Sequence, residues 1–182
     1  MVNIMMKSLW KFYLKIIRRI SILLIFLYNL FGDFMRCPKQ VLVFLYRFNN
    51  SHLEYCLFLR NKGKFWQGIS GGVEDDEDLL DTVKREVYEE TMINVNNIIC
   101  LSYVSSIPIL SINGDFSFGD DVYVSTEYSF GVNITSNDNI VILGEYLSYK
   151  WFSYDDAYNL FKYYSNKTAL WKLNLRLVRN DI

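Results

Sequence analysis

Histidine is almost absent from this chain of 182 residues, and that scarcity excludes several classes of enzyme. The single histidine, His52, follows the polar run Asn49-Asn50-Ser51, which is typical of the tip of a β-hairpin. At such a place we expect His52 to be a solvated turn residue rather than a catalytic base. The sequence therefore excludes histidine-based catalytic triads and metal centres built from several histidines.

Cysteine and net charge are equally limited. The three cysteines, Cys37, Cys56 and Cys100, are too few and too widely spaced for a zinc site or a disulfide framework. We therefore expect reduced thiols in a cytoplasmic protein. The formal net charge is −1, so the composition indicates no extended surface for a polyanion, and no nucleic-acid partner is expected.

A long apolar run is missing as well. Residues 20–31 are uncharged, but spanning a bilayer takes about 18 or more such residues. Residues 1–34 are basic, with Lys and Arg side chains opposed by Asp33 alone. Three interpretations follow: a helix that lies on a membrane surface through residues 7–31, a start-site artefact with Met35 as the true start, or a cleaved signal sequence. Residues 35–182 are expected to form the working domain.

The residues that bear chemistry are concentrated between Gly71 and Ile93. This segment opens with a glycine pair, continues through an acidic turn and ends in a cluster of glutamates. On a helix, Glu86, Glu89 and Glu90 lie on one face, where like charges repel one another. A hard divalent cation such as Mg²⁺, bound by oxygen ligands beside substrate phosphates, relieves that repulsion. For three glutamates alone, a solvated acidic helix face is the alternative.

The full spacing favours the metal site. Gly71 is followed after five residues by Glu77, and after seven more by Arg85-Glu86-Val87-Tyr88-Glu89-Glu90. This pattern resembles the signature of the Nudix hydrolases. The resemblance implies an α/β fold, a Nudix-type α/β/α sandwich with a mixed central sheet and a loop-helix catalytic motif. Met92 stands where the family usually has glycine, so we expect a differently shaped end to the motif helix.

Flanking segments are similar to one branch of this family, the dihydroneopterin triphosphate pyrophosphatases, also described as dATP pyrophosphohydrolases. The matching segments are Arg60–Gly71, Glu145–Trp151 and Ser165-Asn166-Lys167. The resemblance implies Mg²⁺-dependent hydrolysis of a nucleoside or pterin triphosphate to a monophosphate and pyrophosphate. Two alternatives stay open: a Nudix hydrolase of another diphosphate, such as a dinucleotide or a nucleotide sugar, and a noncatalytic Nudix-fold binding module.

The same resemblance assigns roles to the carboxylates. Glu86 and Glu90 are expected to bind Mg²⁺, with Mn²⁺ as a substitute, and Glu89 is expected to support them. Glu145 completes the metal site or acts as the general base. For Glu145, an exposed residue after Gly144 is the alternative.

The remaining roles belong to residues around the motif. Arg85 is expected to hold a motif carboxylate in position, unless it forms an ordinary surface ion pair. Glu77 is expected to brace the loop. Arg60 and Lys64 are predicted to contact the substrate phosphates, and Trp66 to bind substrate or to belong to the core.

Hydrophobic periodicity predicts where the elements lie. We expect strands at 41–48, 54–59, 65–69, 93–105, 122–132 and 146–152, and helices at 78–91, 154–164 and 167–178. Apolar and polar residues alternate through 122–132, which predicts a half-buried strand. Suitable N-caps are Ser153 for the second helix and Ser165 or Asn166 for the third.

Overall fold

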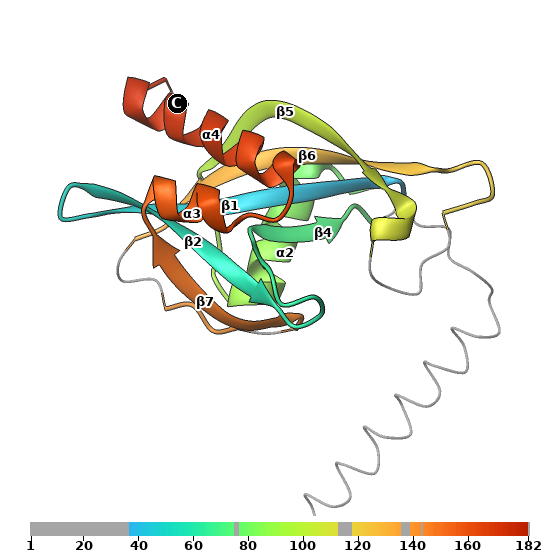
Figure 1. Ribbon diagram of the computed structural model, residues 1–182, viewed down its shortest axis with the longest axis horizontal. Coiled ribbons are helices and arrows are strands. Elements are labelled where there is room, and N and C mark those ends of the chain that lie inside the picture. The colour runs from blue at the N-terminus through green and yellow to red at the C-terminus, as the bar shows by residue number, and fades with distance from the viewer. Residues whose placement is uncertain (1–36, 75–76, 113–117, 136–138, 143, 182) are drawn as a thin grey trace, which may run out of the picture. The chain divides into compact units, whose positions relative to one another are not determined.

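A computed structural model describes residues 37–74, 77–112, 118–135, 139–142 and 144–181 (Figure 1). The predictions for residues 1–34 and for Met35 therefore lie outside the described residues. The strands are β1 (Lys39–Asn49), β2 (His52–Arg60), β3 (Trp66–Gln67), β4 (Ile69–Gly72), β5 (Ile98–Pro108), β6 (Val124–Asn133) and β7 (Tyr146–Phe152). The helices are α2 (Leu79–Thr91), α3 (Tyr154–Leu160) and α4 (Tyr164–Arg179), with a 3₁₀ turn at Ile109–Ser111. Within these residues, no helix is both long and apolar enough to cross a membrane.

Strand β1 is the centre of the sheet. One of its edges pairs in parallel with β6, and the other pairs antiparallel with β4 and then with β2. Beyond these, β2 pairs antiparallel with β3 and β7, and β5 pairs antiparallel with β6. The predicted mixed sheet is thereby confirmed. Because β4 ends at Gly72, this pairing fixes the entry to the motif loop directly against β1.

Helix α2 lies on one side of the sheet and helices α3 and α4 on the other (Figure 1), and there is a hydrophobic core on each side. The first contains Val41, Val43 and Phe58 from the strands and Val83 and Val87 from α2. The second places α3 and α4 over the other face, and its members include Leu42, Phe44, Phe161, Leu170 and Leu173. Alternate residues of β1 feed alternate cores, so this strand is apolar on both faces. The layers are those of an α/β/α sandwich, as predicted.

Burial alternates along the first part of β6, as predicted, but the more deeply buried face is the polar one. Ser125, Glu127 and Ser129 are buried because α4 covers that face, whereas Val124 is 45% exposed and Tyr128 is partly buried. Gly131 permits the close approach: a Cβ there would lie 2.5 Å from Cδ1 of Leu173. Glu127 accepts hydrogen bonds from Gln40 and Ser105, and its burial raises the pKa of the carboxyl group. Hydrogen-bonded polar side chains can be buried, so polarity alone did not mark a solvent-facing side.

The helix ends follow the predictions in part. Ser153 caps α3 by accepting a hydrogen bond from the backbone N–H of Asp156. The N-cap predicted for the last helix was wrong, because α4 begins earlier, after Tyr163, and Ser165 and Asn166 lie inside its first turn. The hairpin at Asn50 and Ser51 is present, and both residues have positive φ angles.

Met92 ends α2 in the left-handed conformation that a glycine would adopt. Its φ is 61° and its N–H donates to the carbonyl oxygen of Tyr88. The expectation that the missing glycine would change the shape of this end was therefore wrong. Helix α2 therefore ends as it would with glycine, although the left-handed conformation costs a residue with a Cβ about 1–2 kcal/mol.

We expect the Met92→Gly variant to be more stable than the wild type by about 0.5–1 kcal/mol, because relief of the left-handed strain exceeds the added flexibility of the unfolded chain. The Met92 side chain is 47% exposed, so little packing is lost. Thermal unfolding should show a Tm higher by about 1–4 °C. Met92→Ala is the matched control, since it shortens the side chain but keeps the strain; an equal gain in both variants would contradict this explanation.

Candidate active site

Helix α2 carries the motif side chains and begins at a well-formed cap. The side chain of Asp78 accepts hydrogen bonds from the backbone N–H groups of Leu80 and Asp81, at 2.8 and 2.9 Å. Glu77, directly before Asp78, lies where the positive end of the helix dipole favours negative charge. The helix thus starts at a fixed residue, which sets the rotation at which Arg85, Glu86 and Glu90 project.

Arg85 joins the loop to the helix. Its Nε donates to Oε1 of Glu77 at 2.9 Å, and its Nη2 donates to Oε2 of Glu77 and to the carbonyl oxygen of Gly72, both at 2.8 Å. Its Nη1 donates to Glu86 at 2.8 Å and to Glu89 at 3.2 Å. These hydrogen bonds to Glu77 also raise the pKa of Arg85, which stays charged.

Both carboxylate oxygens of Glu77 accept hydrogen bonds. Besides Arg85, the hydroxyl of Thr82 and the backbone N–H of Glu74 donate to it. The hydrogen bonds from Arg85 hold the pKa of Glu77 below its usual range. Its contribution to stability is therefore present at neutral pH and is lost as the pH falls through that lowered value. The geometry is that of a brace for the loop, which is the role predicted for Glu77.

Gly71 leaves the space that the Glu86 carboxylate fills. A Cβ on Gly71 would lie 1.7 Å from the carboxylate carbon of Glu86. Any side chain at this position would have to displace the carboxylate. The glycine of the motif therefore allows a buried carboxylate to lie directly against the strand backbone.

Glu90 is the most perturbed carboxylate of the group. Burial, then the negative charges of Glu145 and Glu86, raise its pKa to about 7. Its Oε2 is buried and has no hydrogen-bond partner among the described residues, whereas the backbone N–H of Glu145 bonds to the carboxylate. Gly144, in a left-handed conformation, leaves room for it, since a Cβ there would lie 2.9 Å from Oε1. A carboxylate oxygen in this position has the chemistry of a ligand for a hard divalent cation.

Glu145 reaches the site from the start of β7 and forms an ion pair with Arg60 at the end of β2. Arg60 is nearly buried, while the side chain of Glu145 is 54% exposed. The carbonyl oxygen of Glu145 accepts from the N–H of Asn61 at 2.8 Å, which ties the two strand ends together. Residues 85 positions apart in the sequence thereby meet beside Glu90.

These residues fit a divalent metal ion. Glu86, Glu90 and Glu145 all offer carboxylate oxygens as ligands, and the negative charges of Glu86 and Glu145 act on Glu90. Among the described residues, no partner binds the buried Oε2 of Glu90. In the part of the chain that the structure describes, no three acidic, histidine or cysteine side chains already stand at the spacing of metal ligands. The carboxylate of Glu145 is engaged by Arg60 instead. A metal would be held by Glu86 and Glu90, with Glu145 completing the set.

Lys64 and Trp66 are not brought to the carboxylates in the same way. Lys64 is exposed in the turn before β3, with φ of 48°. Trp66 packs into the core beneath α3 and α4, edge-on to Phe152 with ring centroids 5.3 Å apart. That core lies on the face of the sheet opposite to α2. The core alternative considered for Trp66 therefore describes where its side chain lies.

Tyr146 is a buried residue that the sequence did not single out. Its hydroxyl accepts from the side-chain amide of Gln67 and the N–H of Ser70, and donates to the carbonyl oxygen of Gly68. Its burial raises its pKa to about 12. Tyr146 thus joins β7 to the strands that lead into the motif loop, and so positions the adjacent Glu145. The signal in the sequence that could have drawn attention to Tyr146 was its place directly after Glu145.

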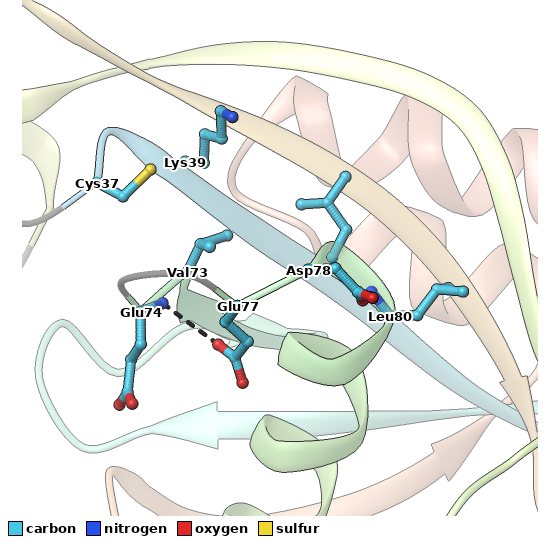
Figure 2. Close-up of a pocket in the computed structure, with 8 residues that line it drawn as sticks. Cys37, Lys39, Val73, Glu74, Glu77, Asp78 and Leu80 are labelled. Carbon is cyan, nitrogen blue, oxygen red and sulfur yellow. Dashed lines mark hydrogen bonds between the residues drawn. The ribbon is translucent and has the colours of Figure 1, made fainter.

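A pocket of about 530 Å³ lies at the other end of the motif (Figure 2). Cys37, Lys39, Glu74, Glu77, Asp78 and Leu80 are among the residues that line it. Figure 2 shows Glu77 turned toward the backbone of Glu74 within the loop. Glu86, Glu90 and Glu145 do not line this pocket, so it is distinct from the carboxylate cluster.

Comparison with known proteins identifies the family. The family model for the NUDIX domain matches residues 38–172, which is most of the chain. The chain belongs to the Nudix family. This Nudix protein is 25% identical over 151 residues to a dihydroneopterin triphosphate diphosphatase from Haemophilus influenzae, which covers 76% of this chain and 89% of the relative.

Two solved structures extend the comparison. A Listeria monocytogenes protein described as a Nudix hydrolase is 36% identical, with a TM-score of 0.71 over 79% of this chain and 97% of its own. The dihydroneopterin triphosphate pyrophosphohydrolase of Escherichia coli is 27% identical, with a TM-score of 0.63 over 74% of this chain and 93% of its own. The predicted resemblance to the family and to this branch is confirmed.

We expect Glu90→Gln to stabilise the metal-free protein at pH 8 but not at pH 5. The raised pKa of Glu90 means that the folded state binds the proton more tightly than the unfolded state. In the wild type, the stability that comes from the protonated carboxyl group is therefore present at low pH and is lost as the pH rises through about 7. Glutamine keeps the neutral form at every pH. The gain at pH 8 should be on the order of 1 kcal/mol after allowance for partial exposure.

Thermal unfolding in a chelating buffer at both pH values measures this difference. Glu89→Gln is the matched control, because it removes a more exposed carboxylate from the same helix. The explanation fails if the Glu90 variant gains no more at pH 8 than at pH 5, or if the control behaves in the same way.

Proposed function

We propose that this Nudix enzyme hydrolyses a nucleoside or pterin triphosphate to a monophosphate and pyrophosphate. The observation that carries the proposal is the pair of carboxylates on α2: Glu86 is buried against Gly71, and Glu90 is half-buried beside Glu145. Buried carboxylates that repel one another are costly unless a cation or a proton compensates them. The relatives named as dihydroneopterin triphosphate diphosphatases support the choice of substrate class.

The proposed metal is Mg²⁺, with Mn²⁺ as a substitute, bound by Glu86, Glu90 and Glu145. When bound, the ion offsets the negative charge that accumulates on the phosphate oxygens in the transition state. Arg85 holds Glu86 and Glu89 in place through charge-assisted hydrogen bonds. Of the three proposed ligands, Glu145 is the most accessible to solvent, which suits a group that takes a proton from the attacking water.

Arg60 supplies a positive charge beside Glu145, whereas Arg85 is bound to Glu86. Its guanidinium group, planar and always charged, matches the geometry of a phosphate. Lys64 lies exposed four residues further along the chain, at the turn that follows β2. We assign Arg60 and Lys64 to the triphosphate, and we leave Trp66 out of the binding site because it packs in the opposite core.

A panel of substrates tests the reaction directly. We expect dihydroneopterin triphosphate or a nucleoside triphosphate such as dATP to release pyrophosphate, with a monophosphate as the second product and no free phosphate. Products are separated by chromatography, and pyrophosphate is measured in the presence of Mg²⁺. Faster turnover of a dinucleotide or a nucleotide sugar would replace the proposed substrate class with the alternative one.

Variants of the carboxylates test the site. Glu86→Gln and Glu90→Gln should each lower kcat on the order of 10²-fold or more, because each removes a ligand of the proposed ion. Glu145→Gln should lower kcat by about 10²–10⁴-fold if it acts as the general base, with a smaller effect on KM.

Asp81→Asn is the matched control on the same helix, where Asp81 is exposed and pairs with Lys84. Its turnover should equal that of the wild type. Circular dichroism confirms that each variant is folded. Near-wild-type turnover of both Glu86→Gln and Glu90→Gln at saturating Mg²⁺ would show that the site is assigned wrongly.

A further inference from the structure

Arg60 occupies an unusual place for a residue that would only bind phosphate. It lies at the end of β2 with its side chain 11% exposed, and it forms an ion pair with Glu145. Its guanidinium carbon lies 5.9 Å from the ring centroid of Tyr146, and its Nε is buried without a hydrogen-bond partner among the described residues. Its positive charge also acts on Glu90. A cation therefore already lies within the carboxylate cluster.

The backbone of Glu145 is fixed, whereas its side chain, within the described part of the chain, is held by its ion pair with Arg60. The carbonyl oxygen accepts from Asn61, and the N–H bonds to the Glu90 carboxylate. The side chain is half exposed and extends to Arg60. A change of rotamer at Glu145 can therefore move its carboxylate from Arg60 to a metal ion while the backbone of the strand stays in place.

Arg85 and Arg60 each pair with a different carboxylate of the cluster. Arg85 binds Glu86 from the side of the loop, and Arg60 binds Glu145 from the side of β2. The charges of Glu86, Glu145 and Arg60 all act on Glu90, whose Oε2 has no hydrogen-bond partner in the part of the chain that the structure describes. This division accounts for the lack of three converging ligands among the described residues, because one of the three carboxylates is turned to Arg60.

We propose that Arg60 is a built-in counter-cation that competes with the divalent metal for Glu145, and that metal binding releases it toward the substrate. The inference rests on the proposed metal site. It assigns Arg60 two opposite effects: it weakens the binding of metal alone, and it strengthens the binding of the triphosphate. An arginine that contacts only phosphate does not compete for Glu145, so its removal would tighten metal binding through charge alone and by the same factor with or without the Glu145 carboxylate.

The test is a titration of Mn²⁺ without substrate, with free Mn²⁺ measured by electron paramagnetic resonance. We expect Arg60→Met, which keeps most of the apolar stem, to bind Mn²⁺ about 10-fold more tightly than the wild type. In the Glu145→Gln background the same substitution should give no tightening, because the competition is for Glu145. The two backgrounds form a double-mutant cycle.

Arg60→Lys is the second variant, and it carries the test if Arg60→Met does not fold. Lysine keeps the charge but has a shorter reach and no planar fork, so we expect a smaller tightening of about 2–3-fold. KM for the triphosphate should rise in both variants. Unchanged or weaker Mn²⁺ binding by the folded Arg60 variants overturns the inference, and so does tightening that persists with Glu145→Gln.

Glu86→Gln separates a failure of this inference from a failure of the proposed function. If Glu86→Gln weakens Mn²⁺ binding while Arg60→Met leaves it unchanged, the metal site stands and the role of Arg60 is wrong. If Glu86→Gln does not weaken binding, the metal site itself is wrong and the inference falls with it.

Discussion

The hydrogen bonds of Arg85 are the constraint on which the rest of the site depends. One guanidinium group binds Glu77 and the Gly72 carbonyl in the loop, and Glu86 and Glu89 on the helix. Hydrogen bonds to charged partners contribute about 1.5–3 kcal/mol each, and the bidentate geometry also fixes orientation. Without this link, the helix could turn relative to β4, and Glu86 would not lie against Gly71.

The surrounding fold keeps both partners of that link in place. Val83 and Val87 seat α2 on one face of the sheet, while β4 is paired to β1 up to Gly72. Tyr146 ties β7 to the same strands, so Glu145 arrives beside Glu90. Two glycines, Gly71 and Gly144, leave the space that the two buried carboxylates need. Repulsion among the carboxylates is thus tolerated because a rigid frame holds them.

Much of this arrangement could be predicted from the sequence, because local patterns determine it. The period of the strands and of α2 follows from which residues are apolar. The resemblance to the Nudix signature implied that Glu77 braces the loop and that Arg85 holds a motif carboxylate. Prediction from the sequence failed where packing between residues distant in the chain determines burial or pairing. Polar β6 residues such as Glu127 are buried because α4 covers them, and nothing in their alternation indicates that cover. The pairing of Arg60 with Glu145 depends on two strands distant in sequence, so no local signal revealed it.

A crystal structure with Mn²⁺ and a non-hydrolysable triphosphate analogue tests the central claim most directly, through the anomalous signal of the metal. The account predicts an ion with oxygen atoms of Glu86 and Glu90 at about 2.0–2.3 Å, the phosphates on its far side, and Arg85 still bound to Glu77. An ion bound by other residues, for example in the pocket beside Glu74 and Asp78, with Glu86 and Glu90 contacting no metal, would contradict it.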